Sequence, residues 1–159
     1  MIYLVSENRQ LFQSEHYEMI SVEKSLEIIQ SWDIVQFDTE TSGRDPHVCK
    51  ILCAQFGNRE AGIQVVVDTT TTNLLLYKDI LETKLIVGHN LKFDIQFLYQ
   101  YEIIPTKVWD TMIIEQLLHL GFDNRFFHYS LQAVADRRLK IDIDKTTRGE
   151  IIWRGLDDQ

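Results

Sequence analysis

Asp38 and Glu40 are separated by a single residue, Thr39, at the end of a predicted β-strand, Ile34–Glu40. Because side chains alternate along a strand, the two carboxylates are expected to point to the same face. Adjacent carboxylates repel and raise each other's pKa, and a divalent cation bound to both removes that conflict. Hard oxygen ligands favour Mg²⁺ or Mn²⁺ over zinc. Taken alone, an Asp-x-Glu pair at a strand end is more often a solvated edge than a metal site.

A second candidate segment lies where a short apolar strand stops at Gly88 and a helix begins. Asn90 and Asp94 are four residues apart, which puts them on one helix face, and a separate apolar stripe on that helix is expected to pack on the sheet. Asp94 is thus predicted to face a site rather than the core. A structural alternative stays open, in which Asn90 caps the helix and Asp94 is a first-turn acid favoured by the helix dipole.

Taken together, the two segments allow Asp38, Glu40 and Asp94 to converge where strand ends meet a helix start. Such a trio suits a two-metal phosphodiesterase, whose ions lie about 3.5–4 Å apart. One ion activates water and the other stabilises the leaving oxygen. We therefore predict a site for two Mg²⁺ or Mn²⁺ ions.

Four segments, in the same order along the chain, resemble the DEDD exonuclease superfamily, which has an RNase H-like fold. They are Phe37–Thr41 (FDTET), Val87–Asp94 (VGHNLKFD), Trp109–Met112 (WDTM), and Ser130–Ala135 (SLQAVA) with Lys140–Lys145 after it. The third is similar to a segment in the proofreading domains of family A DNA polymerases. The resemblance covers nearly the whole chain, and the four motifs in sequence are highly specific.

The resemblance implies a role for each matched position. Three carboxylates would be catalytic and would ligate the two metal ions: Asp38, Glu40 and Asp94. Other matched residues would contact the terminal nucleotide: Thr41, Arg44, Asn90 and Phe93. Arg44 stands where such domains often carry an apolar residue that wedges against a base, and a guanidinium there would stack or hold a phosphate instead.

The family also has a fourth carboxylate, in a late helix with the pattern Tyr-x-x-x-Asp or His-x-x-x-x-Asp. This sequence lacks a match, since Tyr129 is followed four residues later by Ala133. Trp153–Gln159 resembles the stretch that leads into that helix, so we expect a chain that stops just before it. Asp157 and Asp158 are interpreted as the acidic start of the missing helix. Hydrolysis by this chain is therefore expected to be weak or absent.

Composition restricts the class of protein. The chain has 159 residues and is 45% hydrophobic, which suits one compact domain. A net charge of −8 counts against coating of nucleic acid by phosphate neutralisation, but not against an enzyme that holds a strand end with metal ions. No membrane segment or secretory signal is recognisable, so a cytoplasmic location is expected. Cys49 and Cys53 lack partners at zinc-ligand spacing and are predicted to be reduced and largely buried.

Hydrophobic periodicity and turn residues predict the elements that position these side chains. Strands are predicted at Ile2–Val5, Ile34–Glu40, Lys50–Gly57, Ile63–Asp68, Leu85–Val87 and Lys107–Trp109. Helices are predicted at Val22–Trp32, Asn73–Glu82, Asn90–Tyr101, Thr111–Leu120 and Leu131–Leu139, with N-caps at Ser21, Asp110 and Ser130. An antiparallel meander of three strands followed by alternating helix and strand implies an α/β mixed sheet flanked by helices. The resemblance makes this sheet RNase H-like, in a single exonuclease domain over residues 1–159 that lacks its final helix.

The leading functional hypothesis is a proofreading-type 3′–5′ exonuclease that hydrolyses the terminal phosphodiester of single-stranded DNA, joined to a DNA polymerase domain or working beside a polymerase subunit. One alternative is an RNase D-like 3′ exoribonuclease, because the same metal ligands serve both and the discriminating contacts are to the sugar 2′-position. Another is a non-catalytic short form that binds nucleic acid or a partner protein.

Overall fold

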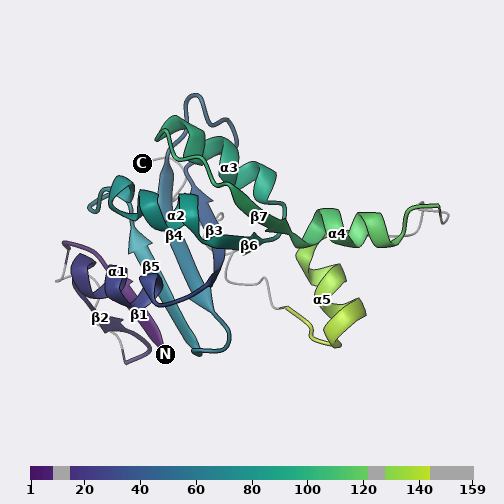
Figure 1. The fold of residues 1–159 in the computed structure, drawn as a ribbon, viewed down its shortest axis with the longest axis horizontal. Coiled ribbons are helices and arrows are strands. Elements are labelled where there is room, and N and C mark those ends of the chain that lie inside the picture. The colour runs from purple at the N-terminus through teal and green to yellow at the C-terminus, as the bar shows by residue number, and fades with distance from the viewer. Residues whose placement is uncertain (9–14, 122–127, 144–159) are drawn as a thin grey trace. The chain divides into compact units, whose positions relative to one another are not determined.

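The computed structural model describes residues 1–8, 15–121 and 128–143. The chain divides into two compact units, Met1–Trp109 and Asp110–Gln159. Figure 1 shows the elements of both units. Over the described ranges, every helix is too short or too polar to cross a lipid bilayer.

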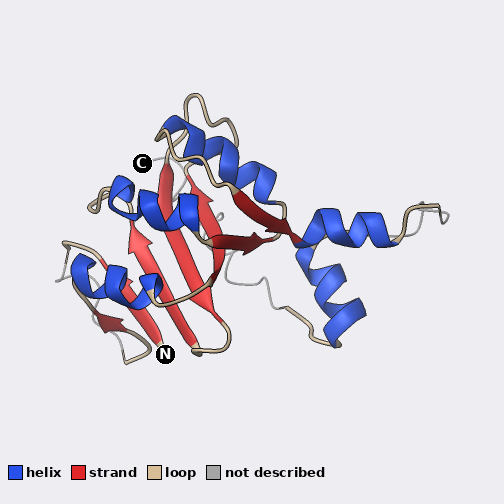
Figure 2. Cartoon of the chain, in the orientation of Figure 1, coloured by secondary structure: helices blue, strands red, loops and turns tan. Residues whose placement is uncertain are grey.

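The first unit is built on a seven-stranded mixed sheet with strand order β2-β1-β5-β4-β3-β6-β7. The strands, red in Figure 2, are β1 (Ile2–Val5), β2 (Glu18–Met19), β3 (Ile34–Thr41), β4 (Ile51–Asn58), β5 (Ile63–Asp68), β6 (Leu85–Gly88) and β7 (Lys107–Asp110). β3, β4 and β5 form the predicted antiparallel meander, while β1 pairs in parallel with β5 and β6 pairs in parallel with β3. The predicted α/β mixed sheet is therefore confirmed.

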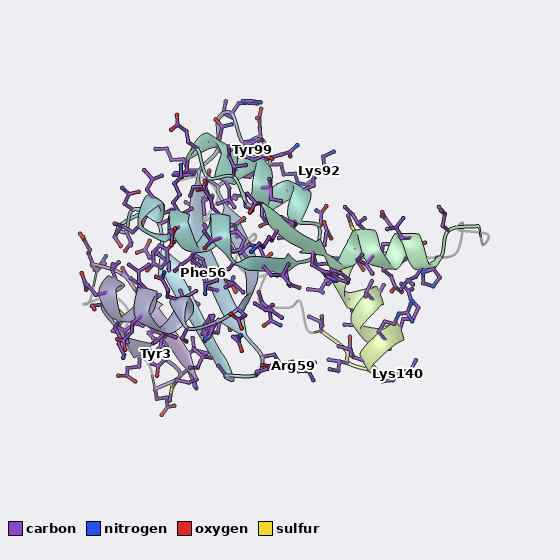
Figure 3. The ribbon with its side chains drawn as sticks, viewed as in Figure 1. Tyr3, Phe56, Arg59, Lys92, Tyr99 and Lys140 are labelled. Atoms are coloured by element: carbon purple, nitrogen blue, oxygen red, sulfur yellow. The ribbon has the colours of Figure 1, made fainter. Side chains whose placement is uncertain are left out.

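Three α-helices pack on one face of this sheet (Figure 1): α1 (Val22–Gln30), α2 (Lys78–Thr83) and α3 (Leu91–Gln100). Alternation along β3 explains the choice of face, because Val35 and Phe37 are buried while the intervening Gln36 is exposed. Phe56 lies at the centre of the first unit, and Lys92 and Tyr99 lie on the outer side of α3 (Figure 3). The core thus fixes which face of β3 carries the acidic residues.

The helix predicted over Asn73–Glu82 is divided in the structure. A short 3-10 helix, η1 (Leu74–Tyr77), is capped by the side chain of Asn73 and leads into α2. The break falls at Tyr77, whose ring is fully buried and stacks on Phe56. Its hydroxyl is 2.6 Å from the Ser25 hydroxyl on α1. Tertiary packing of one tyrosine therefore overrides local helix continuity.

The second unit contains α4 (Thr111–Leu118) and α5 (Leu131–Leu139), which begin at the predicted caps Asp110 and Ser130. The two helices are joined by Glu115, which is only 4% exposed. Its carboxylate accepts hydrogen bonds from Arg137 Nε at 2.8 Å and from Arg138 Nε at 3.0 Å. A buried carboxylate between two arginines therefore ties α4 to α5.

Replacing Glu115 with glutamine is expected to destabilise the second unit, because two guanidinium groups lose their counter-charge. Breaking a fully buried ion pair costs about 3–5 kcal/mol. Arg137 and Arg138 keep 27% and 48% of their side chains exposed, so rehydration reduces the loss. We expect about 1–2 kcal/mol, measured by urea denaturation followed by circular dichroism. Asp136→Asn removes the same charge from an exposed position of α5 and serves as the control. Equal losses in both variants would contradict this account of Glu115.

Candidate functional site

The site forms where β6 stops pairing with β3. The register of these parallel strands ends at Gln36 opposite Val87, and β6 itself ends at Gly88. A methyl group on Gly88 would lie 2.7 Å from the carbonyl oxygen of Phe37 and 2.4 Å from Leu91 Cδ2. Glycine is therefore required for β6 to approach β3 this closely before α3 begins.

The turn into α3 depends on Asn90, which adopts a left-handed backbone with a φ of 63°. Asparagine tolerates this conformation better than most residues. Asn90 is the N-cap residue of α3 and Asp94 is an acid of the first turn, as the structural alternative predicts, but the Asn90 side chain makes no capping hydrogen bond. The residue serves the sharp reversal of the chain between β6 and α3.

Asp94 lies on the buried side of α3 and is 3% exposed. Its Oδ1 accepts one hydrogen bond from the backbone N–H of Thr39, at 3.0 Å, and one from the Thr39 hydroxyl, at 2.6 Å. Asp94 shares its helix face with the buried Leu91 and Leu98, so the predicted separation of the apolar stripe from the carboxylate is wrong. The carboxylate is instead buried against the strand segment that carries Asp38 and Glu40.

Electrostatics link Asp94 to the same strand. Burial raises the pKa of Asp94 and the negative charge of Asp38 adds to the rise, while the hydrogen bonds from Thr39 lower it, and the resulting pKa is about 6. Asp38 and Glu40 are themselves exposed on the other face of β3, as the alternation of the strand predicts. A bound cation would relieve the repulsion between the carboxylates.

The pKa of the Cys53 thiol is affected by the negative charges on the face of β3 that carries Glu40. The register places Cys53 between Glu40 on β3 and Asp68 on β5. Burial, and to a smaller extent the negative charges of Glu40, Asp68 and Asp38, raise the pKa of its thiol to about 11. Both cysteines are free thiols, and they are half-buried rather than largely buried as predicted.

The residues predicted to contact substrate come from the two chain segments that border this site. The register of β3 against β4 shifts between Glu40 and Thr41, and such irregularities re-aim side chains near active sites. The Thr41 hydroxyl donates to the carbonyl of Gly43 at 2.7 Å, and Arg44 in the following turn is exposed. Phe93 is partly buried in the core beside Phe97, with ring centroids 5.1 Å apart. Their role in substrate binding stays a prediction.

Whether a divalent cation suits this site depends on the chemistry and the charge of its donor side chains. Within the described ranges, no three His, Cys, Asp or Glu side chains form a ready metal-binding cluster. Asp94 bonds to Thr39 on the helix-covered face at the end of β3, while Asp38 and Glu40 lie on the other face of the same strand end. All three predicted ligands are carboxylates, the donors that Mg²⁺ and Mn²⁺ prefer. Their convergence on an ion stays a prediction. Asp157 and Asp158 lie outside the described residues.

Sequence reasoning missed the part played by Thr39. The available signal was a hydroxyl residue between two acids, with its side chain on the opposite face of the strand. That pattern places a donor on the helix-covered face, directly behind the acidic pair. Only the docking of α3 shows which acceptor the hydroxyl meets.

Comparison with known proteins identifies the family of the chain. A family model described as 3′–5′ exonuclease matches residues 16–150. DNA polymerase I of Aquifex aeolicus (strain VF5) is 30% identical over 131 residues, which are 79% of this chain and 20% of that protein. The chain therefore spans about a fifth of the length of this curated relative.

Solved structures show the same fold at low identity. Brucella melitensis NrnC with bound Mg²⁺ has a TM-score of 0.59 and 19% identity, covering 91% of this chain and 63% of that one. Escherichia coli RNase D, an exoribonuclease involved in structured RNA processing, has a TM-score of 0.62 and 16% identity, covering 79% and 32%. The RNase H-like fold is thereby confirmed. With its family match extending over most of its length, the chain belongs to the 3′–5′ exonuclease family.

Proposed function

We propose that this chain is a metal-dependent 3′–5′ exonuclease domain of the proofreading type, acting on the 3′ end of single-stranded DNA. The observation that carries the proposal is the attachment of Asp94 to β3 through Thr39, between Asp38 and Glu40. This contact brings the carboxylate of a distant helix to the strand end that already holds two others. The identity to a DNA polymerase I supports a DNA substrate.

Asp38, Glu40 and Asp94 would hold the Mg²⁺ or Mn²⁺ ions. When bound, two such ions activate a water molecule and stabilise the leaving oxygen of the terminal phosphodiester. The chain's own contribution would be to gather negative charge at one end of β3, which would attract the cations to the terminal phosphodiester. Thr41, Arg44, Asn90 and Phe93 would receive the terminal nucleotide: two from the end of β3 and its following turn, and two from the start of α3.

The second candidate is a 3′ exoribonuclease, favoured by the likeness to the fold of RNase D. Carboxylate-bound metal ions serve either sugar, and contacts to the 2′-position decide between them. A non-catalytic binding role is the third possibility, because the sequence shows no Tyr-x-x-x-Asp pattern. A DNA polymerase domain or subunit is the proposed protein partner, and a cytoplasmic location remains a prediction.

A cleavage assay tests the proposal on the full 159-residue chain. Matched 5′-labelled DNA and RNA single strands are incubated with Mg²⁺ or Mn²⁺, and shortening from the 3′ end is followed on a gel. We expect slow release of nucleoside 5′-monophosphates, faster from DNA, that stops with EDTA. Asp38→Asn is expected to lower the rate more than about 100-fold, beyond the effect typical of residues behind the ligands.

Asp79→Asn is the matched control, because Asp79 is exposed in the first turn of α2. Its rate is expected to stay within about twofold of the original. Cleavage that persists in EDTA, or in the Asp38 variant, would overturn the metal-dependent mechanism. Faster cleavage of RNA would favour the exoribonuclease, and strand binding without cleavage would favour the binding role.

A further inference from the structure

Thr39 connects the two halves of the candidate site. Its sequence neighbours are Asp38 and Glu40, whose side chains point to the opposite face of β3. Its own side chain is buried, with 6% exposed, on the face that α3 covers. The backbone N–H and the hydroxyl of this one residue both donate to the same oxygen of Asp94. Thr39 therefore fixes the carboxylate of α3 relative to the carboxylates of β3.

We propose that Thr39 is a positioning residue, whose hydroxyl orients the Asp94 carboxylate for binding a divalent cation. The inference rests on the proposed function, because it gives Asp94 the part of a metal ligand. Two donors on one oxygen restrict rotation of the carboxylate about its bond to the side chain. A single backbone donor would leave that rotation open.

Distance and burial support an orienting contact. The hydroxyl donor lies 2.6 Å from Oδ1, the range of a charge-assisted hydrogen bond. Thr39 and Asp94 are 6% and 3% exposed, so water has little access to replace a missing hydroxyl. Hydrogen bonds behind metal ligands generally fix ligand orientation, and their loss costs about 10–100-fold in metal affinity.

Thr39→Val tests the role, because valine keeps the shape and the backbone donor but removes the hydroxyl. Mn²⁺ is titrated into the full chain, and the free ion is measured by electron paramagnetic resonance. We expect Mn²⁺ to bind Thr39→Val about 10–100-fold more weakly than the original chain. Thr39→Ser keeps the donor and is expected to stay within about twofold. If the valine variant is unfolded by circular dichroism, Thr39→Ala replaces it, with the same expectation.

Thr83→Val is the matched control. The Thr83 hydroxyl is exposed and donates to the carbonyl of Asp79 within its own helix, so its loss should leave Mn²⁺ affinity unchanged. A merely structural contact would lower the stability of Thr39→Val and leave its Mn²⁺ affinity unaltered.

The outcomes separate this inference from the proposed function. If the original chain binds Mn²⁺ and a folded Thr39→Val binds it equally well, the positioning role is overturned and the proposed function stands. If the original chain binds no Mn²⁺ at millimolar concentrations, the metal-dependent function and the positioning role fall together.

Discussion

Asp94→Asn is expected to make the metal-free chain more stable at alkaline pH while abolishing metal-dependent cleavage. The folded-state pKa of Asp94 is about 6, above its ordinary value of 3.8, because the side chain is buried and lies near Asp38. The folded chain therefore holds this proton more tightly than the unfolded chain. The free energy of unfolding should fall as pH rises from about 4 to about 6, and the penalty is complete above that range.

Asparagine at position 94 removes this loss of stability, because it carries no charge, and it keeps a side-chain oxygen that accepts hydrogen bonds from Thr39. A shift of about two pKa units corresponds to at most about 3 kcal/mol. We expect Asp94→Asn to gain about 1–3 kcal/mol at pH 8 and almost nothing at pH 4. Urea denaturation in EDTA at both pH values measures the difference. Asp79→Asn, an exposed helical control, should show no such dependence on pH.

Divalent ions complete the test of Asp94. Because a ligand that binds only the folded state stabilises it, Mn²⁺ should raise the stability of the original chain at pH 8 and have little effect on Asp94→Asn. Equal destabilisation of the variant at pH 4 and pH 8 would contradict the electrostatic account. It would show that the carboxylate of Asp94 stabilises the fold rather than straining it.

Gly88→Ala is expected to be among the most damaging small substitutions in the first unit. The added methyl group would lie 2.7 Å from the carbonyl oxygen of Phe37, a backbone atom of β3 that has no side-chain rotation available to relieve the clash. It would also meet Leu91 at the start of α3. Either β6 or α3 must then move away from β3. We expect a loss of about 3 kcal/mol in the free energy of unfolding.

Gly57→Ala is the matched control, because Gly57 also lies in a strand next to β3. A methyl group there would meet the flexible side-chain end of Gln36, at 3.2 Å, which has room to rotate. Urea denaturation compares the two variants, and Mn²⁺ titration shows whether the start of α3 has moved. A Gly88→Ala protein as stable as Gly57→Ala would contradict the close approach of β6 to β3.

The regular alternation of apolar and polar residues made most of the strands of the sheet predictable. The strand at Ile2–Val5 and that at Ile63–Asp68 have the predicted bounds, and β3 extends the prediction by one residue to Thr41. β2, Glu18–Met19, has two residues and is too short to carry a period. Its pairing depends on β1 being beside it, which no local pattern encodes.

The candidate site was predictable in residue type but not in contacts. Spacing placed Asp38 and Glu40 on one face of a strand, and the structure agrees. The burial of Asp94 follows from the way α3 docks, which depends on the glycine at the end of β6 and on the left-handed Asn90. Helical periodicity assigns a face but does not decide whether a carboxylate on it meets water or a strand backbone.

Because β6 pairs with only part of β3, the lifetime of the candidate site depends on the helix that follows β6. Past Gln36, the amide of Thr39 bonds to a side chain of α3 and not to a neighbouring strand. If the first turn of α3 opens, Asp94 therefore leaves Thr39 and the arrangement of the carboxylates is lost at the same time. The lifetime of the intact arrangement is bounded by the local opening free energy of one helix end, which lies below that of the whole sheet.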